Sequence, residues 1–297
     1  AECVHARVQT LGWANASFFS RRRPSRAAVF LELARRVKRL APPVKNPLPP
    51  LRILRLHASN EAEQAMTTTH EQSRESLRCV LVLGGTGKTG RRIAAGLEAK
   101  GVPIRIGSRA ATPSFDWNDE AGWDACLQNV EAAYINYAPD LAMPGATDAT
   151  QAFVDRAKRL GVRRLVLLSG RGEPEAQACE RIVQESGLEW TVVRASWFFQ
   201  NFSEGAFVDM VHAGRITLPA DDTPEPFVDV DDIADVAIAA LSEPGHAGEV
   251  YEVTGPRLMT FADVACELSE ATGRTIDYVQ VPHNAFIDAA RESGAPK

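Results

Sequence analysis

A glycine-rich turn carries the strongest chemical signal in this sequence. Gly84, Gly87 and Gly90 recur at every third position. They follow the apolar run 80–83 and open the stretch 88–100, whose apolar residues recur at helical spacing. In such a turn bare amides lie at the positive end of a helix dipole, and glycine lets a phosphate approach the backbone closely. The pattern therefore predicts a nucleotide-phosphate site between a strand and a helix.

Two other kinds of turn share part of this pattern. Gly87-Lys88-Thr89 also resembles the end of a triphosphate-binding loop, but that loop needs a glycine at the position of Val82. In a dinucleotide turn, Gly84 would allow the tight bend, Gly87 the close phosphate approach and Gly90 the close helix packing. We therefore favour a dinucleotide, and a plain tight turn without a ligand stays open as the alternative.

Composition limits the class of protein. The chain has 297 residues, of which 45% are hydrophobic and 24% charged, as in ordinary α/β proteins with a substantial core. Its five cysteines are scattered singly, which indicates neither a disulfide framework nor a zinc site and fits a reducing cytosol. No apolar run approaches the roughly 18 to 20 residues that cross a bilayer. We expect a soluble, cytoplasmic protein without a membrane partner.

The distribution of charge divides the chain in two. Residues 1–65 carry twelve Lys/Arg and four Glu, a net charge of +8, whereas residues 66–297 carry a net charge of −13. Five of the ten residues 41–50 are proline, so we expect the first segment to be unstructured or only locally helical. A transit peptide and a basic arm for nucleic acid stay open. Met66 is the first methionine, which favours a non-native leader translated upstream of it.

From residue 78 onward, short apolar runs alternate with amphipathic helical stretches. This alternation predicts an α/β fold with a doubly wound parallel sheet of the Rossmann type. Strands are expected at about 78–83, 102–107, 131–136, 164–169, 190–194 and 249–253, and helices at about 88–100, 119–128, 146–160, 174–186, 230–241 and 260–272. Ligands of such sheets bind beyond the carboxyl ends of the strands, so the side chains at those ends are the candidates for chemistry.

The second expected strand ends in Ser108 and Arg109, where an NAD-selective site usually has an acidic residue for the ribose 2′-hydroxyl. Arg109 can instead hold a 2′-phosphate, with a hydrogen bond from Ser108, so the sequence favours NADP(H) over NAD(H). A solvated loop arginine is the alternative. Asp116 lies in 115–117, which fits a short third strand, and can accept a hydrogen bond from the adenine amino group. A surface turn explains Asp116 nearly as well.

Two further strand ends should border the nicotinamide ribose. Asn136 follows one of these strands, and Ser169 closes the next. The hydroxyl of Ser169 is the catalytic candidate, because it is best placed to orient a substrate carbonyl or the nicotinamide; a plain turn serine is about as common at such a place. The predicted cofactor site comprises Gly84, Gly85, Thr86, Gly87, Lys88, Thr89, Gly90, Ser108, Arg109, Asp116, Asn136 and Ser169.

Motifs spread over most of residues 78–282 resemble those of the NmrA-like group of atypical short-chain dehydrogenases. They are Gly84-Gly85-Thr86-Gly87, Ser108-Arg109, Phe115-Asp116-Trp117, Leu167-Leu168-Ser169, Glu180, Arg194, Trp197-Phe198-Phe199-Gln200-Asn201 and the stretch 227–237. Within the group, the chain looks most like the ergot-alkaloid-type dehydrogenases and their bacterial relatives. The resemblance implies a Rossmann domain within 66–297 and a small, mostly C-terminal substrate region from about 196–228 and 255–297. It also implies NAD(P)H binding and hydride transfer to an imine, quinone or similar acceptor.

The chain departs from typical short-chain dehydrogenases in its acid–base residues. Those enzymes move a proton through Tyr-x-x-x-Lys, in which the lysine lowers the pKa of the tyrosine. The residues four positions after Tyr134, Tyr137, Tyr251 and Tyr278 are Ala, Leu, Gly and Pro, so the standard alcohol-oxidising mechanism has no support. Members of this type usually add helices after the equivalent of 281–282 to cover the substrate. Because this sequence stops at Lys297, either a less complete cover or a truncated sequence stays open.

Two other groups of residues have ordinary structural explanations, which we favour. Trp197, Phe198 and Phe199 fit an aromatic wall beside nicotinamide or a planar substrate, but such clusters are more often core. Asp229 and the pair 231–232 stand at an expected helix start, where capping is commoner than metal binding. The histidines lack ligand-like spacing, and we expect no metal site.

The preferred hypothesis is an NADPH-dependent reductase of a small organic acceptor. Iminium ions and quinones suit it, because they need little acid catalysis from the protein. The rival is a dinucleotide-sensing regulator without turnover, which the resemblance also implies and the missing Tyr/Lys pair favours. Nucleic-acid binding through the basic leader is a weaker third hypothesis, and the net charge of −13 on residues 66–297 argues against a nucleic-acid partner there.

Overall fold

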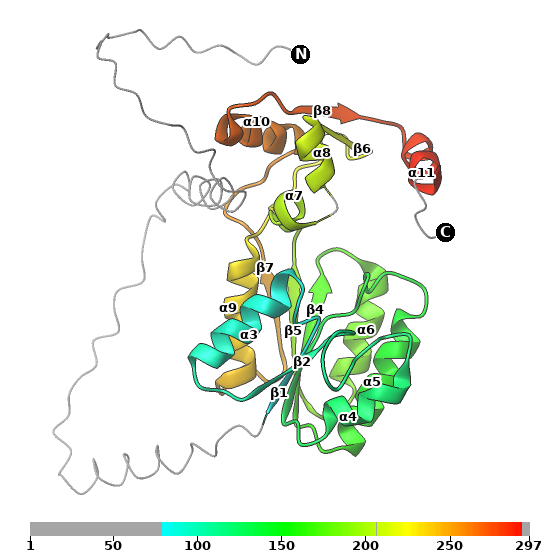
Figure 1. The fold of residues 1–297 in the computed structure, drawn as a ribbon, viewed down its shortest axis with the longest axis vertical. Helices are drawn as coiled ribbons and strands as arrows, with labels where there is room; N and C mark the ends of the chain where they lie inside the picture. Colours follow the sequence, from blue (N-terminus) through cyan, green and yellow to red (C-terminus); the bar gives the residue numbers. More distant parts are fainter. Residues whose placement is uncertain (1–78, 206, 293–297) are drawn as a thin grey trace, which may run out of the picture.

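The computed structural model describes residues 79–205 and 207–292. The basic segment 1–65, assigned to a leader, lies outside these residues. Within them a six-stranded parallel sheet has the order β2-β1-β3-β4-β5-β7 (Figure 1). Its strands are β1 (Val80–Leu83), β2 (Ile104–Gly107), β3 (Ala132–Ile135), β4 (Arg164–Gly170), β5 (Glu189–Ala195) and β7 (Glu249–Val253).

Helices cover both faces of this sheet (Figure 1). One face carries α3 (Lys88–Ala99) and α9 (Val230–Ser242), and the other carries the 3₁₀ turn η1 (Glu120–Gly122), α4 (Trp123–Leu127), α5 (Ala146–Arg159) and α6 (Pro174–Gln184). Strand β1 contributes to both cores, because Val80 and Val82 pack with α3 and α9 while Leu81 and Leu83 pack with α4, α5 and α6. A strand buried on both faces needs a continuous apolar run. The structure confirms the predicted Rossmann-type α/β fold.

The order of the strands fixes where a ligand can enter. β1 lies between β2 and β3, so the chain winds outward in opposite directions on its two sides. In register, Leu83 pairs with Gly107 of β2, and Val82 pairs with Tyr134 of β3. The glycine turn after Leu83 and Asn136 after β3 therefore emerge side by side at this switch point, which is the usual ligand crevice of open α/β sheets.

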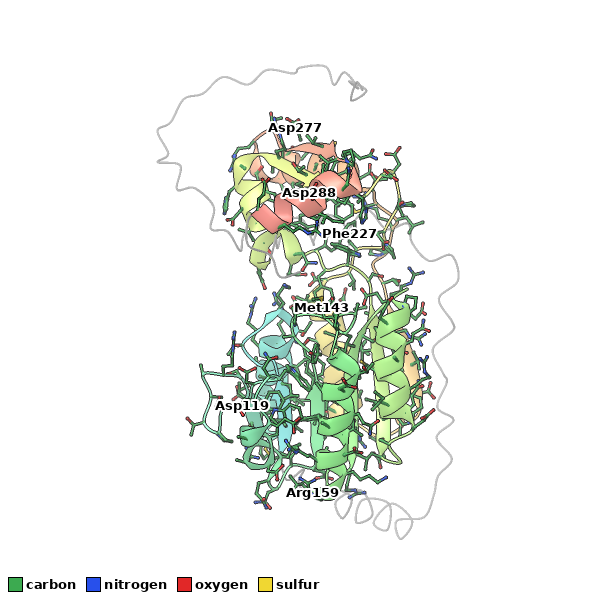
Figure 2. The ribbon with its side chains drawn as sticks, turned by 90° about the vertical axis from the view of Figure 1, so that its right-hand side faces the viewer. Asp119, Met143, Arg159, Phe227, Asp277 and Asp288 are labelled. Atoms are coloured by element: carbon green, nitrogen blue, oxygen red, sulfur yellow. The ribbon has the colours of Figure 1, made fainter. Side chains whose placement is uncertain are left out.

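A smaller region lies beyond the carboxyl ends of the strands (Figure 1). It contains α7 (Asn201–Glu204), α8 (Val208–Ala213), β6 (Arg215–Leu218), α10 (Phe261–Thr272), β8 (Asp277–Gln280) and α11 (His283–Glu292), with β6 and β8 paired in parallel. Phe202, Phe227 and Phe261 form much of its own aromatic core. Figure 2 shows Phe227, Asp277 and Asp288 in this region, and Arg159 at the opposite end of the molecule.

The six strands and six helices expected from the sequence are all present, with ends shifted by a few residues. The third strand expected at 115–117 was wrong: Asp116 makes only an isolated antiparallel bridge with Asp119. Here Phe115 and Trp117 pack edge-to-face and fold into the core beside Trp123, which holds this segment as a loop. Elements β6, β8, α7, α8 and α11 were not predicted.

Helix starts follow the expected capping chemistry. Thr260 caps α10 by accepting from the amide of Asp263, whose carboxylate accepts from the Thr260 amide in return. Asp229 caps α9 by accepting from the amide of Asp231 at 2.9 Å. Among the described residues, none of the helices combines the length and the apolar character required to cross a bilayer.

Candidate functional site

The glycine turn forms a tight bend whose shape depends on glycine. Gly84 has a φ of +63°, in the left-handed region that side chains disfavour. The amide of Gly87 donates to the carbonyl of Gly84 at 2.8 Å, which closes the turn. Helix α3 then begins at Lys88 with Gly87 as its N-cap, and no side chain caps its first turn. The first amides of α3 are therefore left for water or an anionic ligand.

The glycines also allow close contacts with neighbouring groups. A Cβ at Gly84 would lie 2.7 Å from Nδ2 of Asn136, and a Cβ at Gly85 would lie 2.7 Å from Ile106. A Cβ at Gly90 would overlap the carbonyl of Gly84. Asn136 thus rests directly on the turn, and Gly90 serves the packing of α3 against it.

The two threonines of the turn differ in where they point. Thr86 is exposed, as a phosphate ligand would be. Thr89 is buried, and its hydroxyl accepts a hydrogen bond from Tyr134 of β3 at 3.0 Å. Burial raises the pKa of the Tyr134 phenol, so Tyr134 stays a neutral donor to Thr89. The Thr89 side chain therefore anchors α3 on the sheet, and only its backbone can serve a cofactor.

The predicted 2′-phosphate residues lie after β2, as expected. Arg109 is exposed, and within the described part of the chain its guanidinium has no hydrogen bond or ion pair. Ser108 is half-buried, and its carbonyl accepts from the amides of Ala111 and Phe115, which closes the loop that carries Arg109. The geometry leaves Arg109 available to an anion and also fits the solvated alternative.

Asp116, the predicted adenine partner, lies in a surface turn. Its Oδ1 accepts from the amide of Asn118 at 3.0 Å, the pattern of an Asx turn. The next residue has a clearer role near the site: the indole of Trp117 donates to the carbonyl of Asn136 at 3.1 Å, and its ring packs on Tyr137. This aromatic loop therefore fixes the segment that rests on the glycine turn.

A cavity of about 300 Å³ opens at the carboxyl ends of β3, β4 and β5. Its wall brings together three predicted site residues, Lys88, Asn136 and Ser169, with the aromatic residues Tyr137 and Trp197. The other predicted residues of the glycine turn and Ser108, Arg109 and Asp116 are not part of this wall. Figure 2 shows Met143, from the loop between β3 and α5, at the end of the sheet domain that faces the smaller region. The cavity lies at this end.

Ser169 is held by a buried ion pair. Its hydroxyl donates to Oε1 of Glu180 at 2.6 Å, and Arg194 donates to both carboxylate oxygens of Glu180, at 2.6 Å for the shortest contact. The Glu180 side chain is 2% exposed. Because the Ser169 hydrogen is used by Glu180, the group that Ser169 can offer to the cavity is an acceptor oxygen. The role of Glu180 is to orient Ser169 and to join α6 to β5.

Ser196, which the sequence did not single out, also lines this cavity. Its hydroxyl oxygen is buried and, among the described residues, has no hydrogen-bond partner. An orphaned buried hydroxyl is costly unless a ligand or water satisfies it. Ser196 therefore fits a site that receives a polar group, as a dinucleotide cofactor would supply there.

Glu173 also lines the cavity, from the short loop 171–173 between β4 and α6. A Cβ at Gly170 would overlap the Glu173 carboxyl group. Burial raises the pKa of this carboxyl, and the negative charges of Asp140 and Glu175 raise it further. The protonated form of Glu173 is therefore favoured in this cavity.

Lys88 also lines the cavity, beside a cluster of charged side chains. Burial lowers the pKa of its ammonium group; Glu204 opposes this effect, and Arg91 adds to it. Glu204 of α7 pairs with Arg91 and with Arg92, whose Nη2 lies 3.1 Å from Oε1. These pairs join α3 to the smaller region next to the cavity.

The three aromatic residues after β5 divide between two roles. Trp197 and Phe198 line the cavity, and Trp197 is 43% exposed while stacking on Phe207 at a centroid distance of 5.8 Å. Phe199 is buried in the core of the smaller region, against Phe227. The aromatic wall and the core packing that the sequence left open are therefore both present.

Sequence reasoning did not assign Glu173, Ser196, Asp140 or Tyr137 to the site. Glu173 stands before a proline at a helix start, a place where a carboxylate usually caps. Ser196 follows a strand end, and this position was a usable signal. No group of three or more His, Cys, Asp or Glu among the described residues is arranged to hold a metal ion.

Comparisons with known proteins agree with this architecture. The model of the NmrA-like family matches residues 174–293. Agroclavine dehydrogenase of Claviceps fusiformis is 34% identical over 240 residues, which cover 73% of this chain and 81% of that protein. NAD(P)H azoreductase of Xenophilus azovorans is 29% identical, with 73% of this chain and 82% of that protein covered.

The fold is also that of solved structures. The NADPH-dependent quinone oxidoreductase QOR2 of Escherichia coli, in complex with NADPH, matches with a TM-score of 0.57 at 22% identity, over 73% of this chain and 83% of the other. At this identity the likeness concerns the fold alone. The family model over residues 174–293 and the 34% identity to agroclavine dehydrogenase lead to one assignment: the chain belongs to the NmrA-like family.

Proposed function

We propose that this protein is an NADPH-dependent reductase of a small organic acceptor. The observation that carries the proposal is a cavity whose wall includes both Lys88, at the start of α3, and the aromatic side chain of Trp197. A helix start that can hold a phosphate and an aromatic surface in the same cavity suit a dinucleotide whose nicotinamide meets a planar substrate. The names of the curated relatives, a dehydrogenase and an azoreductase, support a redox reaction.

The residues present fit the cofactor. The bare amides of α3 and the glycine turn would hold the pyrophosphate, and Arg109 with Ser108 would hold a 2′-phosphate, which favours NADP(H) over NAD(H). Asn136 and the unpartnered hydroxyl of Ser196 would hold the ribose and the nicotinamide edge. When bound in its reduced form, the cofactor supplies a hydride.

The protein's own contribution is mainly orientation. Ser169, whose hydrogen is used by Glu180, would accept a hydrogen bond from the nicotinamide carboxamide. Trp197 would place a planar acceptor against the ring, and the buried faces of Phe198 would exclude water. Holding two reactants in register can supply several kcal/mol of the barrier without acid–base chemistry, on the order of 7 in the best cases.

A redox-sensing regulator without turnover is the second candidate. The chain has no Tyr-x-x-x-Lys pair, and the hydroxyl hydrogen of Ser169 is used by Glu180. Both features favour binding without the standard proton relay. A sensor would change its affinity for a partner with the redox state of the bound dinucleotide.

Stopped-flow measurement of NADPH oxidation separates these candidates. The full chain is mixed with NADPH and then with menadione, an azo dye or a cyclic iminium salt. A reductase oxidises NADPH only when an acceptor is present, with saturation kinetics for at least one of the three acceptors. NADPH binding without oxidation by any acceptor would support the sensor and contradict the reductase.

A further inference from the structure

We propose that Glu173 is the proton donor of this site, delivering the proton that accompanies the hydride when a neutral carbonyl or azo acceptor is reduced. The inference rests on the reductase function proposed above and names the acid that replaces the missing Tyr/Lys pair. It also separates two acceptor classes that the sequence alone does not distinguish. A neutral quinone or azo compound takes up a proton with the hydride, whereas an iminium ion takes up none.

The backbone brings Glu173 to the cavity wall, close along the chain to Ser169. β4 ends at Gly170, and α6 begins at Pro174, so only three residues connect the strand that carries Ser169 to the helix. Glu173 lines the same cavity as Ser169 and Trp197. A carboxyl group of this loop therefore shares a wall with the residues expected to hold the nicotinamide and the acceptor.

The orientation of the side chain is unusual for its position. Glu173 is the N-cap residue of α6, yet its side chain makes no capping hydrogen bond. It turns back over Gly170, where the missing Cβ leaves room for the carboxyl group. Among the described residues this carboxyl has no hydrogen bond or ion pair, so its oxygens are free for a ligand.

The charges around Glu173 favour its protonated form. Burial raises its pKa, and the carboxylates of Asp140 and Glu175 raise it further. Two cations line the same cavity, Lys88 and Arg171, and the Nε of Arg171 lies 3.5 Å from Glu252, which offsets its charge. An acid with a raised pKa is the form of carboxyl group that can donate a proton near neutral pH.

The reaction balances with groups named here. The hydride adds to one atom of the acceptor's double bond, the π bond breaks, and the other atom takes the proton as the O–H bond of Glu173 breaks. The acceptor gains two electrons, and the reduced nicotinamide loses two. Glu173 is left as a carboxylate and regains a proton from water, which its half-buried position permits.

The test uses the full chain with two acceptors, menadione and N-methyl-3,4-dihydroisoquinolinium, and two carboxamide variants. Glu173→Gln should lower kcat for menadione about a hundredfold and remove the fall of kcat at high pH. Reduction of the iminium salt should change by less than about twofold, since it needs no proton. The matched control, Glu175→Gln, should keep its activity and move the high-pH limb to lower pH, because one neighbouring negative charge is gone.

Two readouts do not depend on turnover. NADPH affinity, measured by fluorescence, should be the same in the wild type and both variants. In a ¹³C-glutamate-labelled protein, one carboxyl should titrate above the usual range and be missing in Glu173→Gln. Glu173→Asp keeps the acid but shortens the side chain, so its kcat should be lower and should still fall at high pH. This variant replaces Glu173→Gln in the test if Glu173→Gln does not fold.

The outcomes separate this inference from the function on which it rests. An unchanged menadione rate and pH profile in Glu173→Gln overturns the inference and leaves the reductase intact. Equal losses with both acceptors also overturn it, because Glu173 would then act by positioning. If the wild type binds NADPH and reduces neither acceptor, the proposed function fails, and the assignment of Glu173 fails with it.

Discussion

The carboxyl group of Glu173 fills the space that a side chain at Gly170 would need. Gly170 is the last residue of β4, and Glu173 is the residue just before α6. The absence of a side chain at Gly170 therefore decides whether the Glu173 carboxyl group can reach the cavity. Position 170 lies within a strand and has no left-handed backbone conformation, so the requirement for glycine there is one of space.

Gly170→Ala should therefore impair catalysis more than cofactor binding. The added methyl group displaces the Glu173 carboxyl, and we expect kcat for menadione to fall at least tenfold while NADPH affinity changes by less than about threefold. Steady-state kinetics and fluorescence titration check this. Gly172→Ala, which has space around its Cβ but a φ of +79°, controls for strain in the same loop. Equal kcat values for Gly170→Ala and the wild type would contradict the account.

The raised pKa of Glu173 predicts a dependence of stability on pH. The folded protein holds this proton more tightly than the unfolded chain does, so Glu173 lowers the free energy of unfolding as pH rises through the window between its unfolded and folded pKa. Glu173→Gln removes this loss. Urea denaturation should show the variant gaining stability over the wild type from pH 4 to pH 8, and Glu98→Gln, an exposed substitution, corrects for the lost charge. A difference that does not vary with pH would argue against the raised pKa.

The ion pair under Ser169 should contribute strongly to stability. Glu180→Gln removes the buried carboxylate from Arg194, which keeps the more exposed Glu252 at 3.6 Å, and weakens the bond from Ser169. We therefore expect the free energy of unfolding to fall by about 2 kcal/mol. Ser169→Ala removes one hydrogen bond and should cost about 1 kcal/mol. Denaturant titration of both variants and the double variant measures their coupling. Additive losses would show that Glu180 does not hold Ser169.

Much of this site was predictable because its signals are local. The strand 80–83, the glycine turn and the start of α3 lie within one short stretch, and its pattern predicts both the strand–turn–helix structure and a nucleotide-phosphate site. The burial of the Thr89 side chain was not predictable, because it depends on a hydrogen bond from Tyr134, a residue 45 positions away. The strands β6 and β8 have four residues each and pair across a long separation, so neither segment shows a pattern of its own.

Glu173 was missed for a different reason. A carboxylate before a proline at a helix start ordinarily caps the helix, so its sequence position gives no sign of another role, and in the structure the Glu173 side chain makes no capping hydrogen bond. What redirects it is the space over Gly170 and the cavity beside it, which only the fold provides.

The glycine turn makes a prediction with a matched control. Gly84→Ala forces a side chain into the left-handed conformation and against Asn136, whereas Gly101→Ala imposes the same backbone conformation, φ +73°, with open space around the Cβ. Both variants should lose about 1 kcal/mol of stability. NADPH affinity should fall at least tenfold in Gly84→Ala and stay unchanged in Gly101→Ala. Equal affinities in the two variants would remove the turn from the cofactor site.

The most direct test of the account is calorimetric titration of the full chain with NADPH and NADH, run beside Arg109→Ala and the control Arg163→Ala at the amino end of β4. We predict that NADPH binds at least tenfold more tightly than NADH, about 1.4 kcal/mol, and that Arg109→Ala alone loses this margin. If neither dinucleotide binds, the glycine turn is only a structural bend and the proposed function is wrong.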